Sequence, residues 1–335
     1  MTARHLTLPA LTALLILSAI AAVTFGPADI TAPEVWSVIL HHFGLIPNSP
    51  VSNLRDAIVW ELRLPRVLTA MAVGAGLALS GTVMQALTRN PLADPYLLGL
   101  SSGAAFGAVL LLLAGLGLFM QLGAFLGSLG ALALALLVAG LLGGATPSRA
   151  ILVGICISAF ASAATSFLIF WSATGDSYRE ILSWLMGSLA GSLWSDAAMA
   201  SAMLLLTAPI ILFSARALDA FAFGDNAAAS LGIDVSRLRW TLLGATALLT
   251  GIMVTIGGAI GFVGLVVPHA VRLATGSRHR ILLPHALLVG AIFMLWTDTA
   301  ARSLFSPREL PVGIITAMIG APMFLLVILR YRRIT

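Results

Sequence analysis

An apolar, glycine-rich segment, Val67–Leu87, lies between two charged runs that contain proline, Arg63–Arg66 and Arg89–Pro95. A helix needs about 20 apolar residues to cross the roughly 30 Å hydrocarbon core of a bilayer. Proline has no backbone N–H and restricts the residue before it, so helices tend to start or stop where it occurs. We therefore predict that Val67–Leu87 crosses a membrane and has a defined turn at each end.

The composition of the chain excludes an ordinary soluble fold. Of its 335 residues, 59% are hydrophobic and 9% are charged, whereas soluble domains have about 25% charged residues. The class that fits is a helical integral membrane protein. The chain has no lysine and therefore no phosphate-binding loop of the GxxxxGK[ST] type. Its net charge of +5 indicates the basic bias of a membrane protein's inner side, and no nucleic-acid partner.

Apolar segments of this length recur, and we predict an all-α membrane protein with a single transmembrane domain over residues 1–335. Residues 1–23 could be a cleaved signal peptide, but their apolar run is longer than a usual signal core, which favours a retained first helix. Ten crossings are expected: Leu8–Phe25, Leu64–Leu87, Tyr96–Leu116, Leu122–Leu142, Ala150–Trp171, Ala197–Phe213, Leu238–Thr255, Ala259–Leu273, Ile281–Thr297 and Pro311–Leu329.

The arginines predict the orientation, because cytoplasmic ends of crossings are enriched in basic residues. Twelve of the 18 arginines fall on the side of the two termini, which predicts that both termini are cytoplasmic. The remaining segments are then a periplasmic loop at 26–62, a periplasmic short helix within 172–196 and a cytoplasmic segment at 215–237. Apolar residues in the last segment predict short helices docked on another protein: Phe221, Phe223, Leu231 and Ile233.

Two short stretches resemble each other. Pro147–Ile155 and Ser306–Ile314 both contain Pro-Arg or Pro-Ser-Arg followed by Val-Gly-Ile, and the predicted topology puts them at opposite ends of the membrane. This similarity is either an inverted-topology repeat, as occurs in many transporters, or chance.

Charged residues inside crossings are rare and usually functional. Asp298 and Arg302 come nearest, near the outer end of the ninth crossing, and their i, i+4 spacing puts them on one helix face, where they could pair. An ion-driven secondary transporter would need acidic residues at mid-membrane, and a membrane enzyme would need a buried polar constellation. Neither pattern is present, so we do not expect an enzyme, and an ion-driven secondary transporter is kept only as the alternative of another class.

The turn Asn90–Pro95 is longer and more strongly patterned than a simple connection requires. It has two prolines, and Asn90 and Asp94 can bond to nearby backbone. A tight, well-capped turn would need two or three such residues, so we interpret the run as a loop that lines a gate.

These stretches resemble the permease subunits of binding-protein-dependent ABC importers for iron chelates and cobalamin. The resemblance covers nearly all of the chain after the first helix and is carried by ordered motifs: Arg63-Leu-Pro-Arg66, Gly74 to Gly81, Gln85, Arg89 to Pro95, Leu98-Gly99, Trp184 to Ser188, Leu231-Gly232, Gly258 to His269, Arg272, His279-Arg280, Leu283-Pro284, Asp298, Arg302 and Glu309 to Gly320.

The resemblance assigns roles to three groups of residues. Outer-face arginines, which would receive acidic residues of a binding protein, correspond to Arg63, Arg66 and Arg302. Arginine suits this role because its guanidinium bonds a carboxylate at two points. Cytoplasmic gate loops correspond to Asn90, Pro91 and Leu92, together with Pro147 and Ser148. The helices that couple to an ATPase correspond to the 215–237 segment, with Asp225, Ala228, Leu231 and Gly232 as candidate contacts.

The resemblance also implies an assembly. It predicts a type II importer permease with inverted repeats in a bacterial inner membrane, as a homodimer with two ATPase subunits and one periplasmic binding protein. The permease itself would bind no cofactor or metal, and ATP with magnesium would be held by the ATPases. The expected substrate is an iron chelate, with haem favoured over a ferric siderophore and cobalamin as the alternative.

Overall fold

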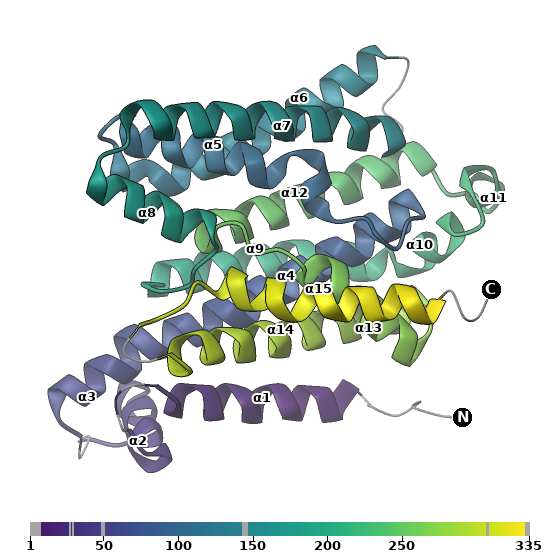
Figure 1. Ribbon diagram of the computed structural model, residues 1–335. Helices are drawn as coiled ribbons and strands as arrows, with labels where there is room; N and C mark the ends of the chain where they lie inside the picture. Colours follow the sequence, from purple (N-terminus) through teal and green to yellow (C-terminus); the bar gives the residue numbers. More distant parts are fainter. Residues whose placement is uncertain are drawn as a thin grey trace.

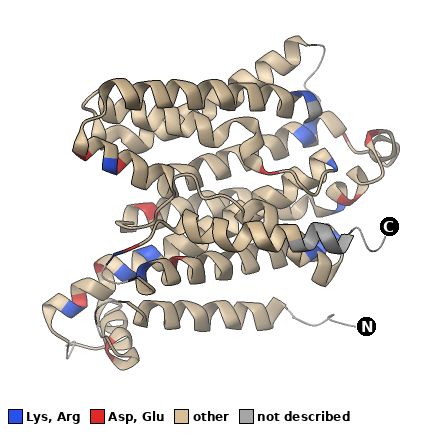
Figure 2. Cartoon of the chain, in the orientation of Figure 1, with Lys and Arg blue, Asp and Glu red and all other residues tan. Residues whose placement is uncertain are grey.

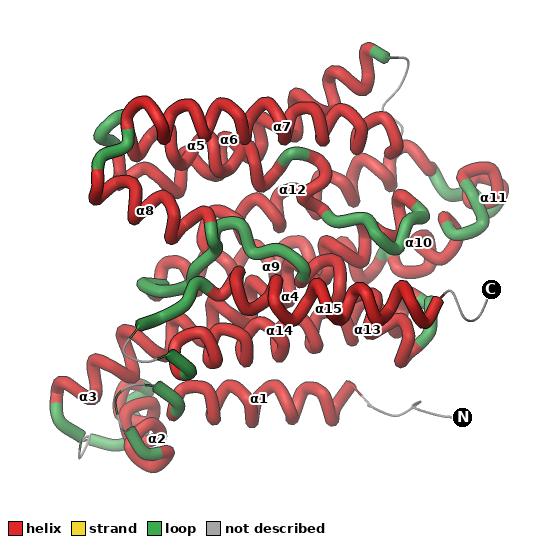
Figure 3. Tube along the Cα trace, viewed as in Figure 1, coloured by secondary structure: helices red, strands yellow, loops and turns green. Residues whose placement is uncertain are grey.

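The computed structural model describes residues 8–26, 28, 30–47, 51–142, 147–305 and 308–331. Within these ranges the chain is almost entirely helical and has no strand (Figures 1 and 3). The α-helices are α1 (Leu8–Thr24), α2 (Ala32–His42), α3 (Asn53–Ala57), α4 (Leu64–Thr88), α5 (Leu100–Leu113), α6 (Met120–Leu141), α7 (Pro147–Ser172), α8 (Gly175–Leu185), α9 (Trp194–Phe213), α10 (Ala215–Phe221), α11 (Asp225–Ser230), α12 (Val235–Gly257), α13 (Val263–Thr275), α14 (His279–Ser303) and α15 (Val312–Tyr331).

The ten predicted crossings correspond to ten apolar helices. In the described part of the chain, six helical segments are long and apolar enough to span a membrane. They contain all or most of α4, α6, α7, α9, α12 and α14. Four shorter apolar helices, α1, α5, α13 and α15, match the other four predicted segments. Charged residues gather toward the two ends of the bundle (Figure 2), which fits a bilayer around its middle.

Helix α4, which contains the apolar segment Val67–Leu87, is the centre of the bundle. It packs against α9, α12, α13 and α14, and 89% of its most apolar stretch is buried. Small residues allow this close packing, since a Cβ added to Gly81 would collide with the backbone of Gly264 in α13. Gly74 meets Gly290 of α14 in the same way.

Helix α7 lies at the edge of the bundle and is the least enclosed of the long helices. Only 17% of its most apolar stretch is buried, and large apolar side chains such as Phe160 and Phe170 are exposed. In a membrane such a face is covered by lipid or by another protein subunit.

The predicted periplasmic loop 26–62 contains regular structure. It includes α2, α3 and a π-helical turn, Ile58–Arg63, that leads directly into α4. Helix α2 starts with a capping box in which the Thr31 backbone N–H donates to Glu34 Oε2 at 2.7 Å. Hydrogen bonds from Thr31 hold the pKa of the Glu34 carboxyl below its usual value. Pro33 occupies the first turn of α2, where proline is tolerated.

The two chain ends and the two similar stretches lie as the topology predicted. The start of α1 and the end of α15 are at the same end of the bundle (Figure 1). Helix α7 begins at that end and α15 begins at the opposite one, as expected for an inverted pair. The short helix predicted within 172–196 is α8.

Candidate functional site

Three arginines from distant parts of the chain meet at the end of the bundle opposite the termini. Arg63 precedes α4, Arg66 is in its first turn, and Arg302 is in the last turn of α14. All three line one cavity of about 240 Å³. Its other walls are Ala28, Ile58, Leu62 and Glu309.

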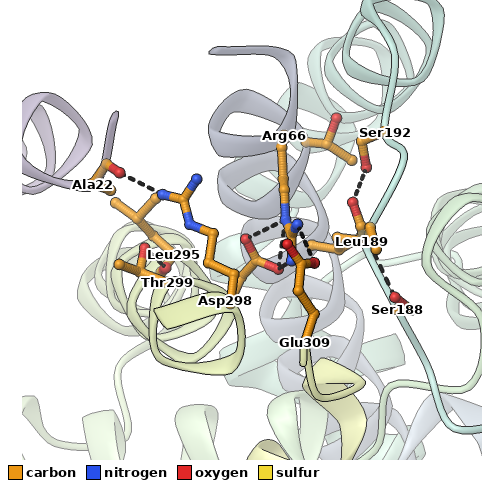
Figure 4. Close-up of polar contacts among 12 residues, drawn as sticks. Ala22, Arg66, Ser188, Leu189, Ser192, Leu295, Asp298, Thr299 and Glu309 are labelled. Carbon is orange, nitrogen blue, oxygen red and sulfur yellow. Dashed lines mark hydrogen bonds and ion pairs between the residues drawn. The ribbon is translucent and has the colours of Figure 1, made fainter. Parts of the chain in front are cut away.

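Arg66 holds two carboxylates (Figure 4). Its Nε donates to both oxygens of Asp298, at 3.1 and 2.9 Å, and its Nη2 donates to Asp298 Oδ1 at 3.0 Å. Its Nη1 donates to Glu309 Oε2 at 2.8 Å. Asp298 is 1% exposed and Arg66 is 8% exposed. Such a fork-shaped, charge-assisted contact compensates the cost of burying the two charges, and removing one partner leaves the other unpaired.

Arg63 and Arg302 bind the end of α1. Arg63 Nη1 donates to the carbonyls of Val23 (2.9 Å) and Thr24 (2.8 Å), and Arg302 Nη2 donates to the carbonyl of Ala22 (Figure 4). The last four carbonyls of a helix lack partners within it. Two guanidinium groups thus cap the C-terminus of α1, where positive charge also favours the helix dipole.

These contacts correct one expectation. The pairing of Asp298 with Arg302 is wrong, because Asp298 bonds Arg66 while Arg302 caps α1. The three arginines that the resemblance assigns to the outer face are all buried, with exposures of 3 to 8%.

The predicted gate residues Asn90, Pro91 and Leu92 form the turn that ends α4. Arg89 adopts a left-handed conformation as its C-cap, and the Asn90 side chain accepts from Leu92 N–H at 2.9 Å. Further along, Asp94 accepts from Tyr96 N–H at 2.8 Å and caps the 3-10 helix Pro95–Leu98. Burial raises the pKa of Asp94 to about 6, so it remains mostly ionised at pH 7. Asn90 and Asp94 thus both bond to the backbone, as expected.

The other gate candidates, Pro147 and Ser148, open α7, and their side chains lie outside the described part of the structure. The 3-10 helix Pro95–Leu98 packs against α7. The contact is close, since a Cβ on Gly154 would collide with the carbonyl of Leu97. The turn after α4 and helix α7 are thus neighbours.

The 215–237 segment forms two short helices, α10 and α11, as expected. Between and after them, Phe223 is 83% exposed and Leu231 is 72% exposed. Ala228 is fully buried and Gly232 takes a positive φ of 79° in the turn. Phe221, expected to dock on a partner, is instead in the core at 1% exposure. The sequence did not reveal this difference, because all these residues are apolar.

Asp225 joins this segment to the end of α4. Its carboxylate lies 2.8 Å from Arg239 of α12 and 3.7 Å from Arg89. Neither partner of Asp225 was predicted from the sequence, and Glu309 was named only as part of a motif, without a role in the site. A charged residue at a helix end needs a partner, but the identity of that partner depends on packing.

Comparison with known proteins places this geometry in a family. The chain matches the FecCD transport family over residues 14–330. It is 40% identical to the hemin transport system permease HmuU of Yersinia pestis, covering 95% of this chain and 94% of that protein. It is 36% identical to the molybdate import permease MolB of Haemophilus influenzae, covering 96% and 95%. It is 39% identical to the vitamin B12 import permease BtuC of Vibrio cholerae, covering 88% and 90%.

Solved structures agree. The chain superimposes with a TM-score of 0.85 on an inward-facing ABC transporter described as metal-chelate type, at 35% identity and with 96% and 98% of the two chains covered. The chain belongs to the FecCD transport family, and it is a multi-pass permease subunit of an ABC importer.

Proposed function

We propose that this permease works as a homodimer that moves an iron chelate, with haem favoured over a ferric siderophore, from a periplasmic binding protein to the cytoplasm. Two ATPase subunits on the cytoplasmic side drive it. The observation that carries the proposal is the path of α4. This one buried helix begins at the arginine cavity and ends at the turn that contacts Asp225 of the 215–237 segment.

At the outer end, we propose that an acidic side chain of the binding protein enters the cavity lined by Arg63, Arg66 and Arg302. Positive charge in a partly enclosed cavity attracts a carboxylate more strongly than the same charge in open water. Glu309 already accepts a hydrogen bond from Arg66 Nη1, and the Glu309 side chain is 40% exposed. An incoming carboxylate would compete with Glu309 for the same guanidinium.

At the inner end, we propose that Phe223 and Leu231 dock on the ATPase. They are large apolar side chains exposed at the end of the protein that also holds most arginines, which the positive-inside rule assigns to the cytoplasm. The neighbouring Asp225 would transmit movement to Arg89 and the turn that holds Asn90, Pro91 and Leu92. The exposed face of α7 supports a second permease copy as its partner.

The substrate assignment rests on the relatives and on one feature of the chain. The described residues hold no group of three or more His, Cys, Asp or Glu side chains placed to bind a metal. This favours transfer of a whole chelate over transfer of a bare ion. Haem is the first candidate because of the hemin relative, and cobalamin is the second because of the vitamin B12 relative.

An ion-driven secondary transporter is disfavoured. Among the described residues, the most deeply buried carboxylates are Asp196 and Asp298, whereas Asp94 is partly buried in the turn after α4. Asp196 and Asp298 lie toward a helix end, in the first turn of α9 and near the end of α14, and Asp298 is neutralised by Arg66. A proton- or sodium-coupled carrier would need such groups at mid-membrane.

Copurification tests the assembly. The permease is expressed with its neighbouring genes, and we expect an ATPase to remain bound through purification. Leu231→Asp places a charge on the proposed docking surface and should abolish this binding while the permease still folds. Leu118→Asp is the matched control, because Leu118 is 99% exposed in the 3-10 turn Gly117–Phe119 that joins α5 to α6, away from the 215–237 segment. Equal binding by both variants would refute the assigned docking surface.

A further inference from the structure

A second cavity lies at the arginine-rich end of the bundle, remote from the arginine cavity. It has a volume of about 400 Å³ and is bounded by α1, α13, α14 and the loop Gly276–Arg278. Its size falls within the range of about 300–1,000 Å³ that is usual for small-molecule sites. Figure 1 shows α1 running beside α14, with its start near the end of α13.

The lining of this cavity is polar on one side and mainly apolar on the other. The loop side is polar, with Thr275, Ser277 and Arg278. The remaining wall is mainly apolar, with Leu11 from α1, Val271 from α13, and Ile281 and Val289 from α14. The one polar side chain in that wall, His285, donates from Nδ1 to the carbonyl of Ile281 at 2.7 Å. A molecule that fills the cavity must therefore have a polar end and an apolar end.

The polar end of the cavity is positively charged. Arg278 is exposed, and within the described part of the chain no acidic group pairs with it. No acidic residue contributes to the lining either. Arg278 is also the N-cap residue of α14, and the first backbone N–H of that helix, on His279, donates to Asp219 at 2.9 Å, so the positive charge at this end of the cavity comes from the Arg278 guanidinium. The polar end of the ligand must therefore be an anion.

We propose that this cavity binds an anionic phospholipid, with its phosphate against Ser277 and Arg278 and one acyl chain along the apolar wall between α1 and α14. A phospholipid is the membrane component that combines these two properties, and basic sites near the inner surface favour anionic headgroups. The lipid would fill the space between α1 and α13 and fasten the first helix to the bundle at this end.

Native mass spectrometry of the purified full-length permease tests the proposal by titration with phosphatidylglycerol and phosphatidylcholine. We expect phosphatidylglycerol to bind more tightly than phosphatidylcholine. Arg278→Gln should weaken phosphatidylglycerol binding about fivefold, the usual contribution of one basic residue near an anionic headgroup. The matched control is Arg280→Gln, since Arg280 is exposed two residues away but does not line the cavity. That variant should bind as the unmodified protein does.

A second variant tests the apolar part independently of charge. Ala274 lines the cavity and is exposed to it, so Ala274→Phe should fill the space and reduce lipid binding while Arg278 is unchanged. Excess inorganic phosphate should not displace the lipid. Equal binding of the two lipids, equal loss in Arg278→Gln and Arg280→Gln, or displacement by phosphate would overturn the proposal. Complete loss of lipid when the ATPase is bound would assign the cavity to a protein interface instead.

Discussion

Arg66 bonds two carboxylates that are far from it in the sequence, Asp298 in α14 and Glu309 before α15. The partners differ in burial, with side-chain exposures of 2% for Asp298 and 40% for Glu309. The same guanidinium therefore has a structural partner and an exchangeable one. This division suggests two different outcomes for mutations within one cluster.

Arg66→Gln should destabilise the protein strongly. It leaves Asp298 buried without its cation, and breaking a buried ion pair costs about 3–5 kcal/mol. The measurement is the unfolding midpoint of the purified permease in detergent. Arg55→Gln is the matched control, because Arg55 pairs with Glu34 at the surface, where ion pairs contribute about 0–1 kcal/mol. Equal loss of stability in the two variants would contradict the structural role of Arg66.

Glu309→Gln should leave the fold nearly unchanged and strengthen docking of the binding protein. Without its competitor, Arg66 Nη1 is available to the incoming carboxylate. One charge-assisted hydrogen bond of about 1.5 kcal/mol corresponds to about a tenfold gain in affinity. Surface plasmon resonance with the cognate binding protein measures the change. Weaker docking would mean that Glu309 belongs to the docking surface and does not compete with it.

At the scale of helices, the sequence predicted the positions of the helices well where hydrophobicity determines those positions. Ten apolar segments correspond to ten apolar helices, and α8 appears where amphipathic sequence indicated it. Helix α2 lies in the segment that was predicted to be a periplasmic loop. Thr31 and Glu34 were the available signal, since their spacing is that of a capping box. The pairing of Arg66 with Asp298 could not be read from spacing, because it depends on how α4 packs on α14.

Packing between α4 and its neighbours gives a prediction at this scale. Gly81→Ala should reduce stability by about 1–3 kcal/mol or more, because its Cβ would meet the backbone of Gly264, which cannot move aside as a side chain could. Gly130→Ala in α6 should be neutral or stabilising, since a Cβ there has open space. Thermal unfolding of the two variants in parallel measures both changes in stability. Similar losses of stability in the two variants would show that α4 and α13 are not in close contact.

For the whole molecule, α4 connects the two proposed sites at opposite ends of the bundle. The arginine cavity lies at its start, and the turn with Asn90, Pro91 and Leu92 lies at its end, beside Asp225. Family membership accounts for the permease role, and the relatives named for hemin, vitamin B12 and molybdate carry different substrates. The identity of the transported substrate is therefore the property that most needs to be measured.

The most direct test is uptake by proteoliposomes that contain the permease with its ATPase, with the cognate binding protein added outside. Haem, a ferric siderophore, cobalamin and molybdate are offered separately, with and without ATP inside. The account predicts ATP-dependent accumulation of haem above the other three, and its loss in Leu231→Asp. Uptake of molybdate alone, or accumulation of none of the four, would contradict it.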